Sequence, residues 1–394
     1  MLNPFNFLTH LRGPLEKAYP IRQENQLQLK IRIIFFWVLF AAFSGSLVVL
    51  LAAYSARTGG ELWAGLAGAG WTGLVFVFMF LFLLSVYESI VAVFLFLLRK
   101  FKFFTKSDAS EADPARRQFI NQAVQGGLIL LSAGLARSAS LHAAELPVAR
   151  VIPVPVKGLP KDLDGFRIVH LTDIHADPFT SRDWVEAIVR IANSLVPHVV
   201  AITGDLADGP VKRMAGIVRP LADLSAPFGR YFVTGNHEYY MAAQGVENWI
   251  SHLEHLGFHV LLNSHRLLTR GAGTVLLGGV TDYSEGNNFP GHASSPAAAI
   301  RDAAPADVRI LMAHQPKSVF EAAEAGFDFQ FSGHTHGGQF FPGQIMMAIA
   351  QPFVSGMHRF RSTSIYVNSG VGCWGPPSRL GSTAEIAAYV LRTE

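Results

Sequence analysis

Residues 333–339 read Gly-His-Thr-His-Gly-Gly-Gln and place two histidines, His334 and His336, two positions apart between glycines. If this stretch is extended, the side chains at i and i+2 project to the same side of the chain. Two imidazoles on one side could hold metal ions in a shared site. A lone His-x-His pair is weak support, because surface and core histidines explain most such pairs. The interpretation therefore depends on the polar residues upstream.

Carboxylate, imidazole and amide side chains recur upstream at the ends of short apolar runs. The four blocks are Asp173-Ile174-His175 after 166–171, Gly204-Asp205 after 199–202, Gly235-Asn236-His237-Glu238 after 230–233, and His314 after 309–312. Short runs of this kind, alternating with helical patterns such as that of residues 181–195, are typical of an α/β domain. Open α/β sheets bind ligands at the carboxyl ends of their strands, so we expect the blocks to lie close together.

The ordered set of blocks resembles the calcineurin-like metallophosphoesterase family, in the form of its membrane-anchored bacterial members. The family pattern is Asp-x-His, Gly-Asp, Gly-Asn-His-Asp/Glu, His and Gly-His-x-His, and the sequence has all five in that order without a substitution at a ligand position. Each block alone is a weak signal, whereas the ordered set is a strong one. The resemblance covers about residues 166–392. It implies a four-layer α/β/β/α sandwich, with two mixed β-sheets face to face and helices outside.

The resemblance also implies a role for each site residue. Seven side chains would hold two divalent ions, with Asp173, His175 and His336 on the first, Asn236, His314 and His334 on the second, and Asp205 bridging both. A hydroxide between the ions would attack phosphorus. His237 would contact the phosphoryl oxygen or protonate the leaving group, a contribution that is typically worth about 10²–10⁴-fold in rate.

The residue types agree with this chemistry. Oxygen and imidazole ligands without thiolate suit manganese, iron or zinc. Two cations about 3.5–4 Å apart neutralise the phosphate oxygens that repel a nucleophile and hold the in-line displacement. Ligand histidines usually donate their other ring nitrogen to a second partner, and Asp177 and Glu238 are candidates for that role.

Other polar residues have simpler interpretations. Asp173, Asp205 and Asn236 taken singly are more typical of turns after strands, and the histidines of residues 334 and 336 reverse that balance. Arg379, in a segment that resembles the C-terminal loop of the membrane-anchored members, is a candidate for binding a substrate phosphate, with a structural ion pair as the alternative. Among the histidines that match no block, we expect the following to be ordinary polar or core residues: His170, His198, His252, His255, His259, His265 and His358.

Composition points to more than an ordinary soluble domain. Half of the 394 residues are hydrophobic and 15% are charged, against about 25% in a typical soluble domain, and long uncharged apolar runs lie in the first 150 residues. The net charge is +3, and the catalytic part has no basic stripe, which excludes nucleic acid as the expected partner. A single cysteine, Cys373, excludes a disulfide within the chain and leaves the compartment open.

Three apolar segments predict membrane spans at about residues 31–54, 72–98 and 118–141. The first is long enough to cross a bilayer at about 1.5 Å per residue. The second follows a glycine-rich stretch, residues 62–70, that we expect to be interfacial, and a hairpin giving four spans is the alternative. The third follows two arginines and resembles a twin-arginine translocation signal, for which cleavage stays open, but a third membrane helix is the favoured interpretation.

These segments divide the chain into a cytoplasmic stretch (1–30), a membrane region (31–144), an extended proline-containing linker (145–165) and a metallophosphoesterase domain (166–394). Positive clusters stay on the cytoplasmic side of a membrane. Three spans then place the domain on the extracytoplasmic side of a bacterial inner membrane.

The sequence predicts a membrane-anchored, dinuclear-metal phosphoesterase that hydrolyses a phosphodiester, phosphomonoester or pyrophosphate bond. Its partners would be the lipid bilayer and a phosphate ester, and the anchor favours a lipid-linked one because it confines the site to the bilayer surface. The alternative is a transporter or scaffold with a regulatory phosphoesterase-like domain. The segment after Gly-His-Thr-His is apolar and either contacts lipid or belongs to the core, through Phe340, Phe341, Met346, Met347, Ile349, Phe353 and Met357.

Overall fold

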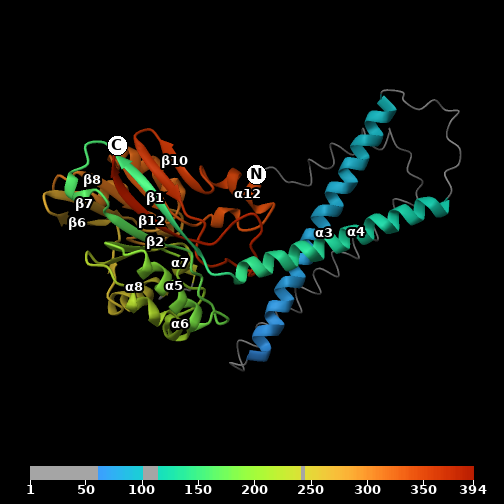
Figure 1. Ribbon diagram of the computed structural model, residues 1–394, viewed down its shortest axis with the longest axis horizontal. Coiled ribbons are helices and arrows are strands. Elements are labelled where there is room, and N and C mark those ends of the chain that lie inside the picture. The colour runs from blue at the N-terminus through green and yellow to red at the C-terminus, as the bar shows by residue number, and fades with distance from the viewer. Residues whose placement is uncertain (1–60, 101–113, 241–244) are drawn as a thin grey trace. The chain divides into compact units, whose positions relative to one another are not determined.

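The computed structural model describes residues 61–100, 114–240 and 245–394 (Figure 1). The chain divides into two compact units, residues 1–70 and 71–394. The second unit holds most of helix α3 (Glu61–Lys100), helix α4 (Pro114–Ala144) and a domain of two β-sheets with helices. The α/β class predicted from the sequence is confirmed.

Within the described residues, two helices are long and apolar enough to cross a membrane by length and composition. The candidate segments are Gly73–Val91 in α3 and Gln118–Ala144 in α4. The predicted span at 31–54 lies outside the described residues. The stretch 62–70, predicted to be interfacial, is helical, because α3 begins at Glu61 and runs without a break; its interfacial position stays a prediction.

The first sheet has six strands and is mixed. Its order is β1 (Val148–Val156), β12 (Glu385–Thr393), β2 (Arg167–Leu171), β3 (Val199–Thr203), β4 (Arg230–Val233) and β5 (His259–Val260). The neighbours from β2 to β5 are parallel, β12 is antiparallel to β2, and β1 is parallel to β12. Residues 145–165, predicted as a linker, therefore include a paired strand, and the folded domain begins before residue 166.

The second sheet also has six strands. Its order is β10 (Gly356–Phe360), β11 (Thr363–Val367), β9 (Phe329–Ser332), β8 (Val308–Met312), β7 (Gly273–Gly279) and β6 (Ser264–Arg270). The four central strands are parallel, and the two edge strands, β6 and β10, are antiparallel to their neighbours. The carboxyl ends of the parallel strands in this sheet therefore lie at one end of the sheet.

Short helices connect the strands. The longer ones are α5 (Arg182–Ser194), α6 (Val211–Val218), α8 (Gly245–His255), α11 (Val319–Ala325) and α12 (Gly343–Ala350), and the single turns are α7 (His237–Tyr240), α9 (Glu285–Asn288) and α10 (Pro296–Ala299). Four 3-10 turns complete the set, at Lys161–Leu163, Arg219–Asp223, Pro316–Ser318 and His336–Gly338. Helix α5 begins where the sequence predicts, because the Ser181 side chain accepts a hydrogen bond from the Trp184 amide, as an N-cap does.

Side-chain alternation in strand β2 shows how the sheets are packed. Ile168 belongs to an apolar cluster that joins residues of both sheets, including Val275 and Phe329. Val169 and Leu171 point to the other face, where they pack in a cluster with the buried residues of α5, α6 and α8. Figure 1 shows these three helices together along one side of the first sheet. A strand buried on both faces reads as a continuous apolar run, which is why this strand was predictable.

Candidate metal centre

The seven predicted ligands and His237 all lie just after strands. Asp173 and His175 follow β2, Asp205 follows β3, Asn236 and His237 follow β4, His314 follows β8, and His334 and His336 follow β9. The two sheets present these carboxyl ends to a common site, where Asp173 and His336 meet although 163 positions separate them in sequence. The structure groups six predicted ligands in two adjoining clusters, and the seventh, Asn236, lies beside the second.

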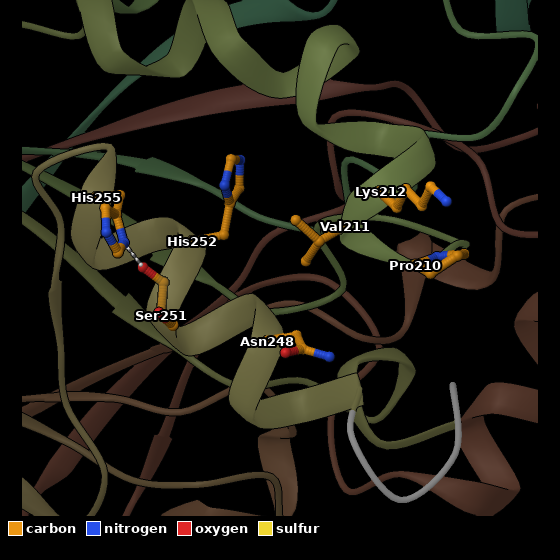
Figure 2. A pocket seen from close by; sticks show the side chains of 7 residues that line it. All are labelled: Pro210, Val211, Lys212, Asn248, Ser251, His252 and His255. Atoms are coloured by element: carbon orange, nitrogen blue, oxygen red, sulfur yellow. Dashed lines mark hydrogen bonds between the residues drawn. The ribbon is translucent and has the colours of Figure 1, made fainter.

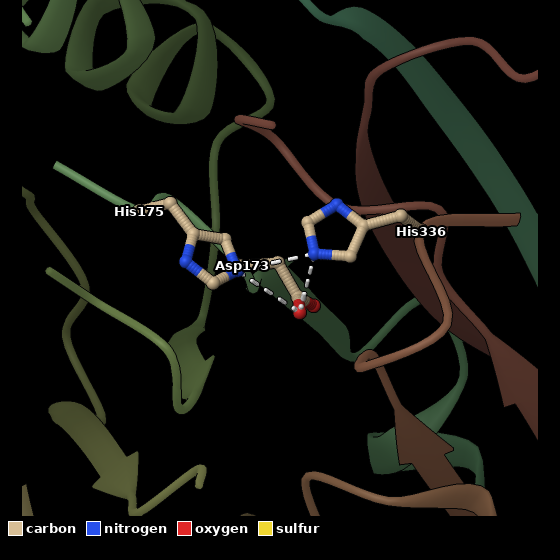
Figure 3. Close-up of side chains that lie close together, drawn as sticks. All are labelled: Asp173, His175 and His336. Atoms are coloured by element: carbon tan, nitrogen blue, oxygen red, sulfur yellow. Dashed lines mark hydrogen bonds and ion pairs between the residues drawn. The ribbon is translucent and has the colours of Figure 1, made fainter. Parts of the chain in front are cut away.

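Asp173, His175 and His336 form the first cluster (Figure 3), in which one ligand atom of each lies within 4.8 Å of the others. Nε2 of His336 is 3.2 Å from Oδ1 of Asp173 and 3.1 Å from Nε2 of His175. All three side chains are buried. The figure shows the carboxylate of Asp173 and the two ring nitrogens directed at one point.

Asp205, His314 and His334 form the second cluster. Nε2 of His314 is 3.3 Å from Oδ2 of Asp205, 3.2 Å from Nδ1 of His334 and 3.1 Å from Oδ1 of Asn236. The same Oδ2 of Asp205 is 3.5 Å from Nε2 of His175 in the first cluster. Asp205 therefore lies between the two groups.

These spacings fit divalent cations. Ligand atoms with bonds of about 2.1 Å at right angles around one ion stand about 3 Å apart, close to the separations of the nitrogen pairs His175–His336 and His314–His334. The donors are imidazole nitrogen and carboxylate or amide oxygen, a set that suits manganese, iron or zinc. The chemistry and the geometry of the residues both agree with two adjacent metal ions.

Hydrogen bonds outside the clusters orient the ligand rings. Nδ1 of His314 donates to the carbonyl oxygen of Thr203 at 2.7 Å, and Nδ1 of His175 donates to Oδ1 of Asp208 at 2.8 Å. Each bond places a proton on Nδ1 and directs Nε2 into the site, where Nε2 can bind an ion once it has lost its own proton. Partners of this kind are usual for metal-binding histidines, because they fix the ring and its tautomer.

Asp208 is a site residue that the sequence interpretation missed. Its Oδ1 also lies 2.7 Å from Nδ1 of His237, so one carboxylate oxygen accepts from two histidines. Burial alone would raise the pKa of Asp208, but the hydrogen bonds from His175 and His237 lower it to about 2. The prediction that Asp177 supports a ligand is wrong, because its carboxylate accepts from the amides of Phe179 and Thr180 in its own turn.

Glu238 supports the loops rather than a ligand histidine. Its carboxylate accepts hydrogen bonds from the backbone amides of Asp205 at 3.0 Å, Leu206 at 2.8 Å and Gly235 at 2.7 Å. Burial and the charge of Asp205 raise the pKa of Glu238 to about 7. One side chain thus connects the loops after β3 and β4, which carry Asp205 and Asn236.

The carboxylates around His175 and His314 favour positive charge at these two rings. Burial acts to lower the pKa of His175, but its hydrogen bond to Asp208 and the charge of Asp205 raise it to about 9. The same carboxylate, Asp205, raises the pKa of His314 well above its ordinary value against the effect of burial. Buried carboxylates that draw protons onto neighbouring histidines are equally suited to cations, whose binding displaces those protons.

The ligand loops use an uncommon backbone conformation. Five residues have positive φ: Asp173 (54°), His175 (46°), Asp205 (50°), His334 (69°) and His336 (51°). Such values are rare for residues other than glycine and occur most often at functional sites. Residues 333–339 are not extended throughout, because His336 begins a 3-10 turn. The histidines of this stretch consequently enter different clusters instead of sharing one side.

Glycine is required beside two ligands. A Cβ at Gly333 would overlap Oδ2 of Asp173 and Oγ1 of Thr172, and one at Gly235 would overlap Oδ1 of Asp205. The loops can therefore approach the carboxylates closely only with glycine at these positions, which explains the Gly in two of the sequence blocks.

A cavity of about 310 Å³ opens over both clusters. His237 and five of the seven predicted ligands, all except Asp173 and His314, form its polar wall. Phe340, Met346, Met347 and Trp374 form much of an apolar wall. The ring of His237 stands 5.0 Å from that of Tyr240, another lining residue. A substrate that enters would place a polar group against the clusters and an apolar group against the second wall.

Arg379 does not line this cavity. Its side chain is buried, and its guanidinium donates to the carbonyl oxygens of Ser369, Gly370 and Gly372. These contacts hold the loop that packs on Asp173. Contact between Arg379 and a substrate phosphate stays a prediction.

A second cavity, of about 640 Å³, lies between α6 and α8 (Figure 2). It is lined by Pro210, Val211, Lys212, Asn248, Ser251, His252 and His255. In Figure 2 the His255 ring bonds back to its own helix, where Nδ1 donates to the Ser251 carbonyl oxygen at 2.6 Å. This cavity shares no residue with the metal clusters.

The comparisons with known proteins agree on one family. The sequence profile of the calcineurin-like phosphoesterases matches residues 166–338. A Danio rerio protein named "Transmembrane protein with metallophosphoesterase domain" is 36% identical over 271 residues, which cover 67% of this chain and 62% of that protein. An uncharacterized metallophosphoesterase of Helicobacter pylori is 32% identical over 277 residues, which cover 69% and 71%. The chain thus spans about three fifths of the length of the Danio rerio relative and about seven tenths of the length of the Helicobacter pylori relative.

Proposed function

This chain belongs to the calcineurin-like metallophosphoesterase family, and from that premise we propose that it is a phosphoric ester hydrolase. We infer further that it is a membrane-anchored enzyme with two divalent metal ions. It would cleave a phosphodiester, phosphomonoester or pyrophosphate bond. The observation that carries this proposal is the pair of ligand clusters with Asp205 between them. A carboxylate between the two clusters can contact the ion held by each of them.

Seven residues would hold the ions. Asp173, His175 and His336 would bind the first, Asn236, His314 and His334 the second, and Asp205 both. Bound manganese, iron or zinc ions supply positive charge that neutralises the phosphoryl oxygens and activates water as a nucleophile.

His237 is the residue we propose as proton donor. Its Nδ1 donates to Asp208, so Nε2 is the ring nitrogen left for a substrate in the cavity that His237 lines. A proton at Nε2 can pass to the oxygen of the leaving group. The backbone amide of His237 also donates to Oδ1 of Asp205 at 2.9 Å. This bond occupies Oδ1 and holds Oδ2 between the two clusters.

The membrane setting is supported by two apolar helices within the described residues and by the name of the Danio rerio relative. We propose a multi-pass anchor with the domain on the extracytoplasmic side, and a lipid-linked phosphate ester as substrate. The four-layer α/β/β/α arrangement belongs to the same proposal. It is supported by the apolar clusters between the sheets and under the helices on each outer face.

Hydrolysis by the full chain tests the proposal. The detergent-solubilised protein with manganese should release p-nitrophenolate from bis-p-nitrophenyl phosphate or p-nitrophenyl phosphate, and the ratio of the two rates gives the ester class. Asp205→Ala should abolish turnover, and His237→Ala should lower it by about 10²–10⁴-fold, the usual contribution of a general acid. His255→Ala, in the second cavity, is the matched control and should leave the rate unchanged.

The opposite result is equally informative. A folded protein that binds divalent metal and hydrolyses neither ester, nor any lipid-linked phosphate, would exclude hydrolysis as its activity. The regulatory domain of a transporter or scaffold, which is the alternative from the sequence, would then be the better interpretation.

A further inference from the structure

Helix α12 (Gly343–Ala350) presents an apolar face to the surroundings of the domain. None of its eight residues is buried. The side chains of Ile345, Met346 and Ile349 are 57%, 66% and 85% exposed, and at about 100° per residue they lie on one face of the helix. A contiguous exposed apolar face of this kind marks a contact with a partner or a membrane.

The sequence around α12 lacks charge over a long stretch. From Gly337 to Met357 there is no Asp, Glu, Lys or Arg. An exposed surface in water usually carries charged residues of both signs. A helix without any, flanked by the exposed aromatic ring of Phe341, is better suited to the hydrocarbon side of a bilayer interface.

The apolar face continues into the active-site cavity. Met346 lies on the exposed face of α12 and also lines the cavity. Trp374 and Tyr240 line the cavity too, and both are more than half exposed. The mouth of the cavity is therefore apolar, while its floor holds the two clusters of predicted metal ligands. A molecule with a phosphoester at one end and a hydrocarbon chain at the other matches both surfaces.

The segment that leads into α12 also contacts a candidate membrane span. The ring of Phe340 is 5.8 Å from that of Phe78, and the ring of Phe341 is 5.6 Å from that of Phe82. Both partners lie in the Gly73–Val91 segment of α3. The apolar surface of α12 is thus continuous in sequence with residues that pack on a helix suited to lipid.

We propose that α12 inserts its apolar face among the acyl chains of the bilayer that holds α3, and that the cavity takes the phosphoester of an amphiphile whose chain lies along this face. The second clause rests on the proposed phosphoesterase function, whereas the first does not. The occupant of the α12 surface is lipid, because its face is uncharged and the segment that leads into it packs on an apolar helix.

A fluorescent probe tests the insertion without using activity. The full chain carrying Cys373→Ser and Ile349→Cys is labelled with an NBD maleimide and placed in phosphatidylcholine–phosphatidylglycerol vesicles. Lipids with a nitroxide on the acyl chain should quench the probe at 349 at least about twofold, since interfacial helices place their apolar face about 5–10 Å into the headgroup–acyl boundary. The matched control is Leu267→Cys on β6, an exposed apolar site at the opposite edge of the second sheet from β10.

A pair of substrates tests the second clause. Hexadecyl and ethyl p-nitrophenyl phosphate share the same reacting bonds and leaving group and differ in the chain. With manganese, the wild type should favour the hexadecyl ester by at least about tenfold in kcat/KM, because several methylene groups are removed from water. Ile349→Asp should lower that ratio at least about fivefold and leave ethyl ester turnover unchanged. Leu267→Asp should alter neither, and Ile349→Leu should keep the preference.

The outcomes separate the two proposals. Turnover of both esters without chain preference, together with an unquenched probe at 349, overturns the inference and leaves the phosphoesterase function intact. Such a result would mean that another protein segment or a second copy covers α12. A quenched probe with hydrolysis of neither ester upholds the insertion of α12 and overturns the alkyl phosphodiester as substrate, whereas the phosphoesterase function is decided separately by the p-nitrophenyl phosphate assays described above.

Discussion

One carboxylate oxygen of Asp208 accepts hydrogen bonds from His175 and from His237. The first histidine is a proposed metal ligand, and the second is the proposed proton donor. A single residue therefore fixes the ring orientation of a group from each part of the mechanism. Neither ring can turn without losing a hydrogen bond to a half-buried, negatively charged partner, and bonds to a charged group are the stronger kind.

We predict that Asp208→Asn lowers both manganese affinity and turnover by about 10–100-fold, the usual effect of changing a ligand's supporting partner. The amide keeps the size of the side chain but replaces the charge that holds the two Nδ1 protons. Calorimetric titration with manganese and steady-state kinetics would measure the two effects. Asp177→Asn, which alters a carboxylate in a separate turn, is the control, and an equal loss there would contradict the assignment.

Metal binding is expected to depend on pH in a defined direction. The pKa of His175 is raised to about 9, so the metal-free ring carries a proton at neutral pH and must lose it to bind an ion. The manganese affinity should therefore rise as pH increases from 6.5 to 8.5, by about tenfold per pH unit for each proton displaced. Titrations in buffers of different ionisation enthalpy would count the protons, and a pH-independent affinity would argue against these ligands.

The sequence was sufficient to nominate the ligands because their order and spacing form a pattern. Asp208 carries no such signal, since an aspartate in a turn after a strand is ordinary. Asp177 was chosen instead because it is close in sequence to His175. The actual partner comes from the neighbouring strand, 33 positions away, and that proximity exists only in the folded sheet.

The loop after β9 is the element most sensitive to side-chain size. We predict that Gly333→Ala destabilises the protein by about 2 kcal/mol or more, as backbone or packing strain at a special site does, and weakens manganese binding, because the added Cβ overlaps Asp173 and Thr172. Thermal unfolding followed by circular dichroism measures the first effect.

A second glycine provides the matched control for that change. Gly216 lies within α6, and a Cβ there meets nothing within 4 Å. Gly216→Ala should stabilise the protein by about 0.5–1 kcal/mol, since alanine favours a helix interior. A similar loss of stability in both variants would show that the close approach at Gly333 is not the cause.

Central elements were predictable and edge elements were not. β2, β3, β4 and β8 are buried on both faces and read as continuous apolar runs. β1 has two prolines and mostly exposed residues, so its sequence resembles a connector. Proline is tolerated on an edge strand, where some backbone amides face solvent. β6 and β10 are also exposed edge strands, and the sequence pattern alone did not predict them.

At the scale of the molecule, the domain should need β1. This strand pairs with β12 over nine positions and contributes Val154 to the cluster between the sheets. We predict that a fragment of residues 166–394 unfolds at least about 5 °C below one of residues 146–394, because roughly 2–4 °C accompanies each kcal/mol in a domain of this size. Scanning fluorimetry of both fragments measures the difference.

Equal melting temperatures would contradict a structural role for β1 and restore residue 166 as the boundary. The sequence could not place this strand, because its pairing with β12 joins residues more than 230 positions apart. The order of strands within each sheet is likewise set by long-range contacts. Periodicity predicts which segments are strands but not their neighbours.

The position of β12 between β1 and β2 also sets the timing of assembly during synthesis. β12 leaves the ribosome after the other strands of its sheet and must enter between two that have already emerged. Until β12 has been made, the edges of β1 and β2 that it will pair with are open, and open strand edges are prone to aggregation. The first sheet therefore cannot be completed before residues 385–393 have been synthesised.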